Sequence, residues 1–148
     1  MSATQLTTAP ATASAGTAPA GTAPRTWLRR FLALDAVVTG ANGLGYLTLS
    51  GPLGDLLGVD RGLLLGLGAF LTVFAAAVGL LAVRPQPPAL GVRFVVEANL
   101  LWAALSVAAQ VLWLSPTTAG AVWIPMQAVT VAGFAVLQYG ALRAASRA

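Results

Sequence analysis

Four long apolar runs follow one another along the chain after its first thirty residues. They cover about residues 31–50, 62–83, 94–114 and 122–142. Each run holds about 20 residues, which is enough for a helix to cross a hydrocarbon core of about 30 Å. The first three runs are followed by Gly51-Pro52, Arg84-Pro85 and Ser115-Pro116, and proline cannot continue a helix. The pattern predicts an all-α polytopic membrane protein, a four-transmembrane-helix bundle formed by residues 27–148.

Residues 1–26 contain no such run. They are mostly Ala, Thr, Pro, Gly and Ser, and a short Thr-Ala-Pro unit recurs at residues 8–10, 17–19 and 22–24. Because this composition offers no large apolar face to bury, we predict a disordered tail. The segment also lacks the charged and apolar regions that precede the cleavage site of a signal peptide.

Arginine is the only basic residue type in the chain, and its positions predict an orientation. One side of the predicted bundle carries Arg25, Arg29, Arg30, Arg84, Arg93, Arg143 and Arg147. The other side carries Arg61 alone, beside Asp55 and Asp60. Short cytoplasmic loops hold the excess of positive charge in membrane proteins. Both termini are therefore predicted to be cytoplasmic.

The net charge of +4 would also suit a protein that binds nucleic acid. The arginines, however, stand singly or in pairs at the edges of apolar runs and form no basic stripe, so no nucleic-acid partner is expected. The expected partners are the lipid bilayer, a second copy in a homo-oligomer, or another membrane protein.

Two further features concern the membrane surface. The first connection, residues 51–61, reads GPLGDLLGVDR, and it predicts either a short helix lying in the interface or a simple loop. Trp27 precedes the first run, and Trp113 and Trp123 flank the third connection. These positions are typical of interfacial belts, because amphipathic rings prefer the headgroup region.

Composition excludes most catalytic chemistry. Hydrophobic residues make up 57% of the chain and charged residues only 8%, against about 25% charged in soluble domains. The chain has no Cys, His or Lys, and hence no thiol nucleophile, imidazole ligand or amine for a Schiff base. Neither a nucleotide-binding nor a hydrolase motif has the required context. We expect no catalytic residue, cofactor or metal, and therefore no enzyme.

The candidate site begins with a polar face on the first run. Asp35, Thr39, Asn42 and Tyr46 follow an i, i+4, i+7, i+11 spacing, which places them on one side of a helix. Exposure of this face to lipid would be costly, so it should face other helices or a wet crevice. Asp35 lies one turn inside the run, from where its charge could also reach the interface. The face is read either as interhelical hydrogen bonding, worth about 0.6–2 kcal/mol per contact, or as a path for a substrate, ion or proton.

Glu97 completes the candidate site on the third run. It follows Arg93 by four residues, a spacing that favours an ion pair along the helix. Asp35 should lie at a similar depth, and two acids that met in a dry site could hold a proton; pairing of either acid with arginine is the alternative. Further polar faces are predicted for Asn99, Ser106 and Gln110, and for Gln127, Thr130 and Gln138. These are expected to form a polar seam that packs the bundle.

Packing between the runs has two predicted features. The second run carries a face of small residues, namely Gly62, Gly66, Ala69, Ala76 and Gly79, which we expect to pack closely within the monomer rather than in a dimer. The first and third runs also share an order of features, from Arg-Phe through an acid followed by Ala to Leu-Ser and proline. This weak repeat suggests two hairpins related by a pseudo-twofold axis along the membrane normal.

A resemblance adds to this picture. The segment LDAVVTGANGLGYLTLSGPLGDLLGV, together with the later LSPTTAG, resembles uncharacterised four-span integral membrane proteins of high-GC Gram-positive, actinobacterial bacteria. The resemblance covers about Arg29 to Leu142. It implies a four-helix protein of the bacterial plasma membrane and supplies no activity or site residues.

Two functions follow as expectations. The first is a non-enzymatic component that packs or interacts with itself or with another membrane protein, since small faces abound and reactive groups are missing. The alternative is a small oligomeric transporter or ion- or proton-conducting protein that uses Asp35 and Glu97.

Overall fold

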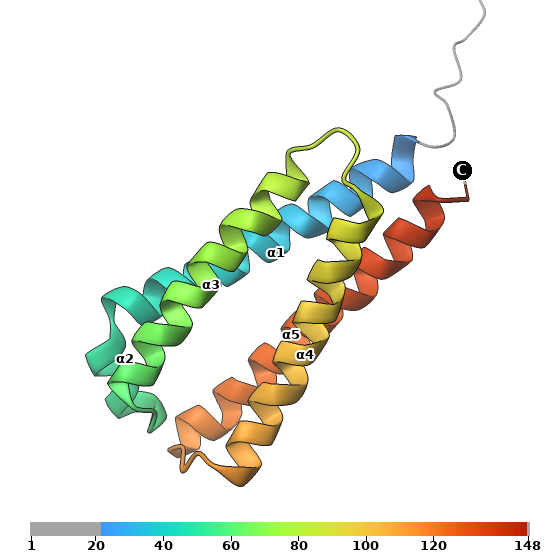
Figure 1. Cartoon of the computed structure of the whole chain (residues 1–148). Helices are drawn as coiled ribbons and strands as arrows, with labels where there is room; N and C mark the ends of the chain where they lie inside the picture. Colours follow the sequence, from blue (N-terminus) through green and yellow to red (C-terminus); the bar gives the residue numbers. More distant parts are fainter. Residues whose placement is uncertain (1–21, 148) are drawn as a thin grey trace, which may run out of the picture.

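The computed structural model describes residues 22–147, and within them every regular element is an α-helix (Figure 1). The helices are α1 (Thr22–Thr48), α2 (Ser50–Leu57), α3 (Arg61–Ala82), α4 (Ala89–Leu112) and α5 (Thr118–Ala145). The helices α3, α4 and α5 are each long and apolar enough to cross a membrane, and the bent pair α1–α2 would add a fourth span if it counts as one. The predicted all-α class is confirmed.

The first helix begins earlier than the sequence pattern predicts. Residues 1–21 of the predicted tail lie outside the described residues, but residues 22–26 belong to α1 and correct the predicted boundary. Pro24 is tolerated because a helix has no intrahelical partner for the N–H groups of its first turn. One turn later, Leu28 and Leu32 are fully buried. Tertiary packing of these leucines therefore extends the helix into residues 22–26, whose own composition does not favour a helix.

The segment after α1 is a helix rather than a simple loop. The helix α1 ends at Thr48, and α2 leaves it at an angle of 99°. Gly58 ends α2 with φ 69°, the left-handed conformation in which glycine has no Cβ penalty. The N–H groups of Gly58 and Val59 both donate to Gly54 O. Of the two alternatives predicted for residues 51–61, the structure supports the helix.

The four long helices follow the order α3, α1, α5, α4 around the bundle (Figure 1). The helix α1 packs against both α3 and α5, and α4 packs against α5, whereas α3 and α4 hardly meet. A pseudo-twofold axis that relates α1 to α4 and α3 to α5 would exchange the α1–α5 contact with the α3–α4 contact. The two contacts would then be equally extensive, and they are not. The predicted repeat is thus not reproduced in the packing, and the bundle is open between α3 and α4.

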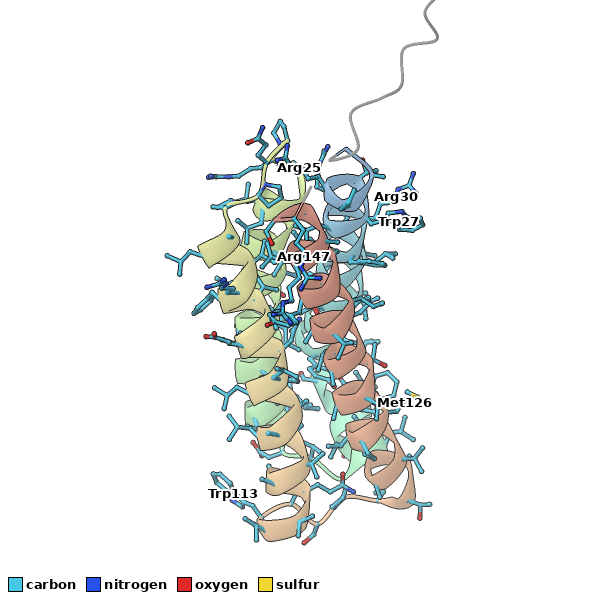
Figure 2. The ribbon with its side chains drawn as sticks, turned by 90° about the vertical axis from the view of Figure 1, so that its right-hand side faces the viewer. Arg25, Trp27, Arg30, Trp113, Met126 and Arg147 are labelled. Carbon is cyan, nitrogen blue, oxygen red and sulfur yellow. The ribbon has the colours of Figure 1, made fainter. Side chains whose placement is uncertain are left out.

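The two ends of the bundle differ in charge and packing. We call the end where α1 and α4 begin the arginine-rich end; Arg25, Arg30 and Arg147 lie there, whereas Trp113 lies at the opposite end (Figure 2). The larger apolar cluster consists of Leu28, Leu32, Val78, Ala82, Val92, Val95, Val96, Ala135 and Leu142. It fills the bundle at the arginine-rich end. A smaller cluster of Tyr46, Leu64 and Leu71 lies nearer the opposite end.

The small-residue face of α3 does not pack as predicted. Gly62, Gly66, Ala69 and Ala76 are exposed, and a Cβ added at Gly66 would meet nothing within 4 Å. The close contact instead joins α3 to α1 through another glycine of α3. A Cβ at Gly68 would lie 2.9 Å from Gly43 O, so the two backbones touch there. The buried face of α3 is the one that carries Leu64, Gly68 and Leu71.

Candidate functional site

The carboxyl group of Asp35 lies at the centre of a buried hydrogen-bond network. Asp35 is 0% exposed. The Thr39 hydroxyl donates to its Oδ1 over 3.0 Å, and its Oδ2 accepts from Asn99 Nδ2 at 2.7 Å and Gln138 Nε2 at 2.8 Å. We call these four residues the Asp35 site.

Each residue of the Asp35 site has a simple structural origin. Thr39 lies one turn after Asp35 on α1, so its hydroxyl is aligned with the carboxyl group. Asn99 comes from α4 and Gln138 from α5. The two amide side chains therefore join α4 and α5 to α1, although the backbones of α1 and α4 are not neighbours.

No opposite charge accompanies this carboxyl group. All three of its hydrogen-bond partners are neutral, and no arginine among residues 22–147 forms an ion pair with it. The prediction that the charge of Asp35 could reach the interface is wrong, because its side chain turns into the bundle. A carboxylate buried without a cation is costly in a low-dielectric interior, and within the described residues only these three hydrogen bonds offset that cost.

Gln138 adds an unusual feature to the site. The residue is 0% exposed, and its Oε1 atom has no hydrogen-bond partner among the described residues. A glutamine side chain presents donors on one side and an acceptor on the other. Its Nε2 faces Asp35 and donates to the carboxyl group, whereas its Oε1 stays unpaired.

A second polar cluster lies about two to three turns after Asp35 along α1. The Tyr46 hydroxyl accepts from Gln127 Nε2 at 2.6 Å and from Trp123 Nε1 at 2.9 Å. Asn42 Nδ2 donates to Gln127 Oε1 at 3.3 Å. Because Tyr46 is buried, the polar face predicted on the first run does point into the bundle along its whole length.

Two hollows lie beside these polar groups. The smaller has a volume of about 30 Å³, room for about two or three water molecules, since each needs about 10–15 Å³. Its polar lining consists of Thr39, Asn42, Asn99 and Gln127. The larger, which we call the lateral cavity, has a volume of about 740 Å³ and is lined by α3, α4, α5 and residues around α2. Trp102 and Gln127 line both hollows, which therefore adjoin.

The two sides of the Asp35 site differ in polarity. The small hollow, which adjoins the lateral cavity, is lined by Thr39 and Asn99, two of the three residues that contact Asp35. Toward the arginine-rich end, the larger apolar cluster lies beyond the site, and its members Leu32 and Val92 are 0% exposed. Polar residues thus lie on one side of Asp35 and apolar residues on the other, an arrangement that we call the half-path.

Glu97 lies apart from the other candidate residues. The structure brings together Asp35, Thr39, Asn42 and Tyr46 on the inner face of α1, but Glu97 is exposed on the outside of α4. Within residues 22–147 it makes no hydrogen bond or ion pair, so the ion pair expected with Arg93 is not formed. The two acids therefore do not share a site.

Sequence reasoning placed Asn99 and Gln138 in a packing seam and did not link them to Asp35. The only feature of the sequence that pointed to Asn99 and Gln138 was that both are polar residues within apolar runs. Trp123 was expected in an interfacial belt, yet its indole donates to Tyr46 inside the bundle. Trp102 carried no signal at all, and it lines both hollows.

Searches of protein-family models, of curated proteins and of solved structures found no match to this chain.

Proposed function

We propose that this chain is a four-span protein of the bacterial plasma membrane, with both termini in the cytoplasm, that carries a proton on Asp35 during a transport cycle. The observation on which this depends is the fully buried carboxyl group without a cationic partner. Ionisable residues at such depth are expensive and mark ion or proton pathways in membrane proteins.

A proton fits the site better than a metal ion. Metal ions such as Na⁺ or Mg²⁺ need several oxygen ligands turned toward them. Around Asp35, two amides and one hydroxyl turn hydrogen atoms toward the carboxyl oxygens instead. A proton needs only one acceptor, and the unpaired Oε1 of Gln138 offers a partner for the resulting carboxylic acid.

The half-path favours a carrier over a channel. A channel needs a continuous polar route, whereas a carrier exposes its site to one side at a time. Here polar residues and small hollows lead from the lateral cavity to Asp35, and apolar residues close the other side. The proposed cycle would open the cluster around Leu32 and Val92 while the lateral cavity closes.

A second candidate function is the packing or interaction component that the sequence favoured. It is supported by Glu97, an exposed acid on a long apolar helix with no partner among residues 22–147, which another membrane protein or a second copy could cover. In this reading the Asp35 site would only hold α1, α4 and α5 together.

Infrared difference spectroscopy of the protein in lipid, between acidic and alkaline buffer, separates the two candidates. The chain contains only four Asp and Glu residues, so each carboxyl band can be assigned by substitution. We expect the C=O stretch of a protonated carboxyl group in a dry environment. The band should vanish in Asp35→Asn and persist in the matched control Glu97→Gln.

Two outcomes would contradict proton carriage. One is a carboxyl band that is unchanged in a folded Asp35→Asn protein. The other is the lack of any pH-dependent band in the wild type, which would leave the packing role. Elution as a single symmetric peak in detergent serves as the test of folding for each variant.

The proposed orientation has its own test. Since the chain has no native cysteine, single cysteines can be introduced at the exposed positions Asp55, Pro88, Thr118 and Ser146. A membrane-impermeant thiol reagent added to intact cells should label cysteine at 55 and 118, but at 88 and 146 only after lysis. Labelling at 88 in intact cells would reverse the orientation.

A further inference from the structure

We infer that the lateral cavity binds a lipophilic organic cation, an apolar molecule with a single positive charge. This inference rests on the proposed function, because it names the substrate class of the same carrier. Its volume of about 740 Å³ falls within the range of about 300–1,000 Å³ for small-molecule sites.

The walls of the cavity are apolar and aromatic. Leucines from α3 and α4 form much of its surface, and the rings of Tyr46, Trp102, Trp113 and Trp123 border it. The Trp102 ring also stacks on Phe70 with centroids 5.6 Å apart, so its position is fixed between α3 and α4. Indole faces attract organic cations through their quadrupole, and more strongly where water is excluded.

The charged residue among those that line the cavity is an acid, Asp60 at the start of α3. The Oδ1 atom of Asp60 caps the helix by accepting from Leu63 N at 2.9 Å, and Oδ2 has no hydrogen bond within residues 22–147. Asp35 does not line the cavity; it is buried beyond the small hollow, where Asn99 contacts it. None of the described residues that line the cavity is basic.

Shape and charge together select the occupant. A neutral acyl chain would fill the apolar space but would make no use of the aromatic rings and of Asp60. An anion would be repelled by the Asp60 carboxylate. A cation with an apolar surface suits the walls, the rings and the charge of Asp60 at once.

Tetraphenylphosphonium and tetraphenylborate are suitable probes, because they have nearly the same size and shape and opposite charges. We expect the full-length protein in detergent to bind tritiated tetraphenylphosphonium saturably. Unlabelled tetraphenylphosphonium should displace it. In separate samples without the phosphonium, because the two ions pair with each other in solution, tetraphenylborate should show no saturable binding.

Two substitutions test the cavity itself. Trp102→Leu should weaken binding by roughly two- to thirty-fold, the range of a cation–π contact, and its control Trp27→Leu removes an indole outside the cavity. Asp60→Asn should also weaken binding several-fold while keeping the helix cap, since asparagine caps helices as well as aspartate. Its control is Asp55→Asn on α2, an exposed acid that does not line the cavity.

The inference would be overturned by equally strong saturable binding of tetraphenylborate in its own assay, by the lack of saturable tetraphenylphosphonium binding, or by equal effects of the cavity variants and their controls. The infrared band of Asp35 is measured without any ligand. If the Asp35 band is present but tetraphenylphosphonium does not bind, the inference about the cavity is refuted and proton carriage stands. If tetraphenylphosphonium binds saturably but the Asp35 band is absent, proton carriage is refuted and the cavity's ligand stands.

Discussion

Replacing Asp35 with leucine is expected to unfold or strongly destabilise the bundle, whereas replacing it with asparagine is expected to leave the fold intact. Leucine branches at the same carbon as aspartate but is larger, and it cannot accept a hydrogen bond. The amides of Asn99 and Gln138 would then be buried without acceptors. Each unsatisfied group costs about 1–3 kcal/mol, so the two amides together would cost about 2–6 kcal/mol.

Asparagine avoids this cost because it can reproduce the network without a charge. Its carbonyl oxygen can accept from the amides of Asn99 and Gln138, and its amino group can donate to Thr39 Oγ1. The hydroxyl of Thr39 now donates to Asp35, but a hydroxyl accepts equally well. The same substitution that removes the carboxyl band is thus expected to keep the three helices together.

Thermal unfolding in detergent, followed by circular dichroism, measures the difference. The control is Glu97→Leu, which replaces an exposed acid without hydrogen bonds among the described residues and should leave the unfolding temperature unchanged or raised. If asparagine at position 35 proved as destabilising as leucine, the charge itself would hold the fold. If leucine were harmless, the network would not join the helices.

The helical runs were predictable because length and apolarity are local properties of the chain. A segment of about 20 apolar residues must form its own backbone hydrogen bonds in lipid, and a helix does so. The polar face of α1 was predictable for the same reason, since the spacing of Asp35, Thr39, Asn42 and Tyr46 is fixed by helix geometry. That this face turns inward followed from the cost of exposing it to lipid.

The rotation of each helix about its axis was not predictable. Lipid tails are as apolar as leucine, so hydropathy does not tell which face of a run meets another helix. Asn99 and Glu97 illustrate this point. They are two residues apart on α4, almost opposite each other around the helix, and the packing of α4 on α5 buries the first and exposes the second. Whether Asp35 meets Glu97, which the sequence left open, therefore depended on which of two equally polar faces of α4 turns inward.

Of the Asp35 site, the sequence predicted only the part on α1, namely Asp35 and Thr39. The two amide donors, Asn99 and Gln138, lie 64 and 103 residues from Asp35 along the chain, and no local pattern connects them to it. The α1–α2 bend and the opening between α3 and α4 likewise depend on tertiary contacts. The lateral cavity is lined by both α3 and α4, whose backbones approach each other at few points, a property of the assembled bundle rather than of any one run.

Replacing Gly68 with alanine is expected to destabilise the bundle, although the same change at Gly66 should stabilise it or do nothing. In an open helix position, alanine is favoured over glycine by roughly 1 kcal/mol. At Gly68, however, the new Cβ would lie 2.9 Å from Gly43 O and 3.0 Å from Leu47 N. Both are backbone atoms that cannot turn aside, so α1 and α3 must separate at a cost of about 1–3 kcal/mol.

Gly43 gives the reciprocal test, because its Cβ would lie 2.8 Å from Thr72 N and 3.0 Å from Gly68 O. Unfolding temperatures of Gly43→Ala, Gly68→Ala, their double variant and the control Gly66→Ala would be compared in one detergent. Once one methyl group has moved the helices apart, the second meets less resistance. The double variant should therefore lose less than the sum of the single losses. Additive losses, or a stabilised Gly68→Ala protein, would mean that α1 and α3 do not approach as closely as these distances require.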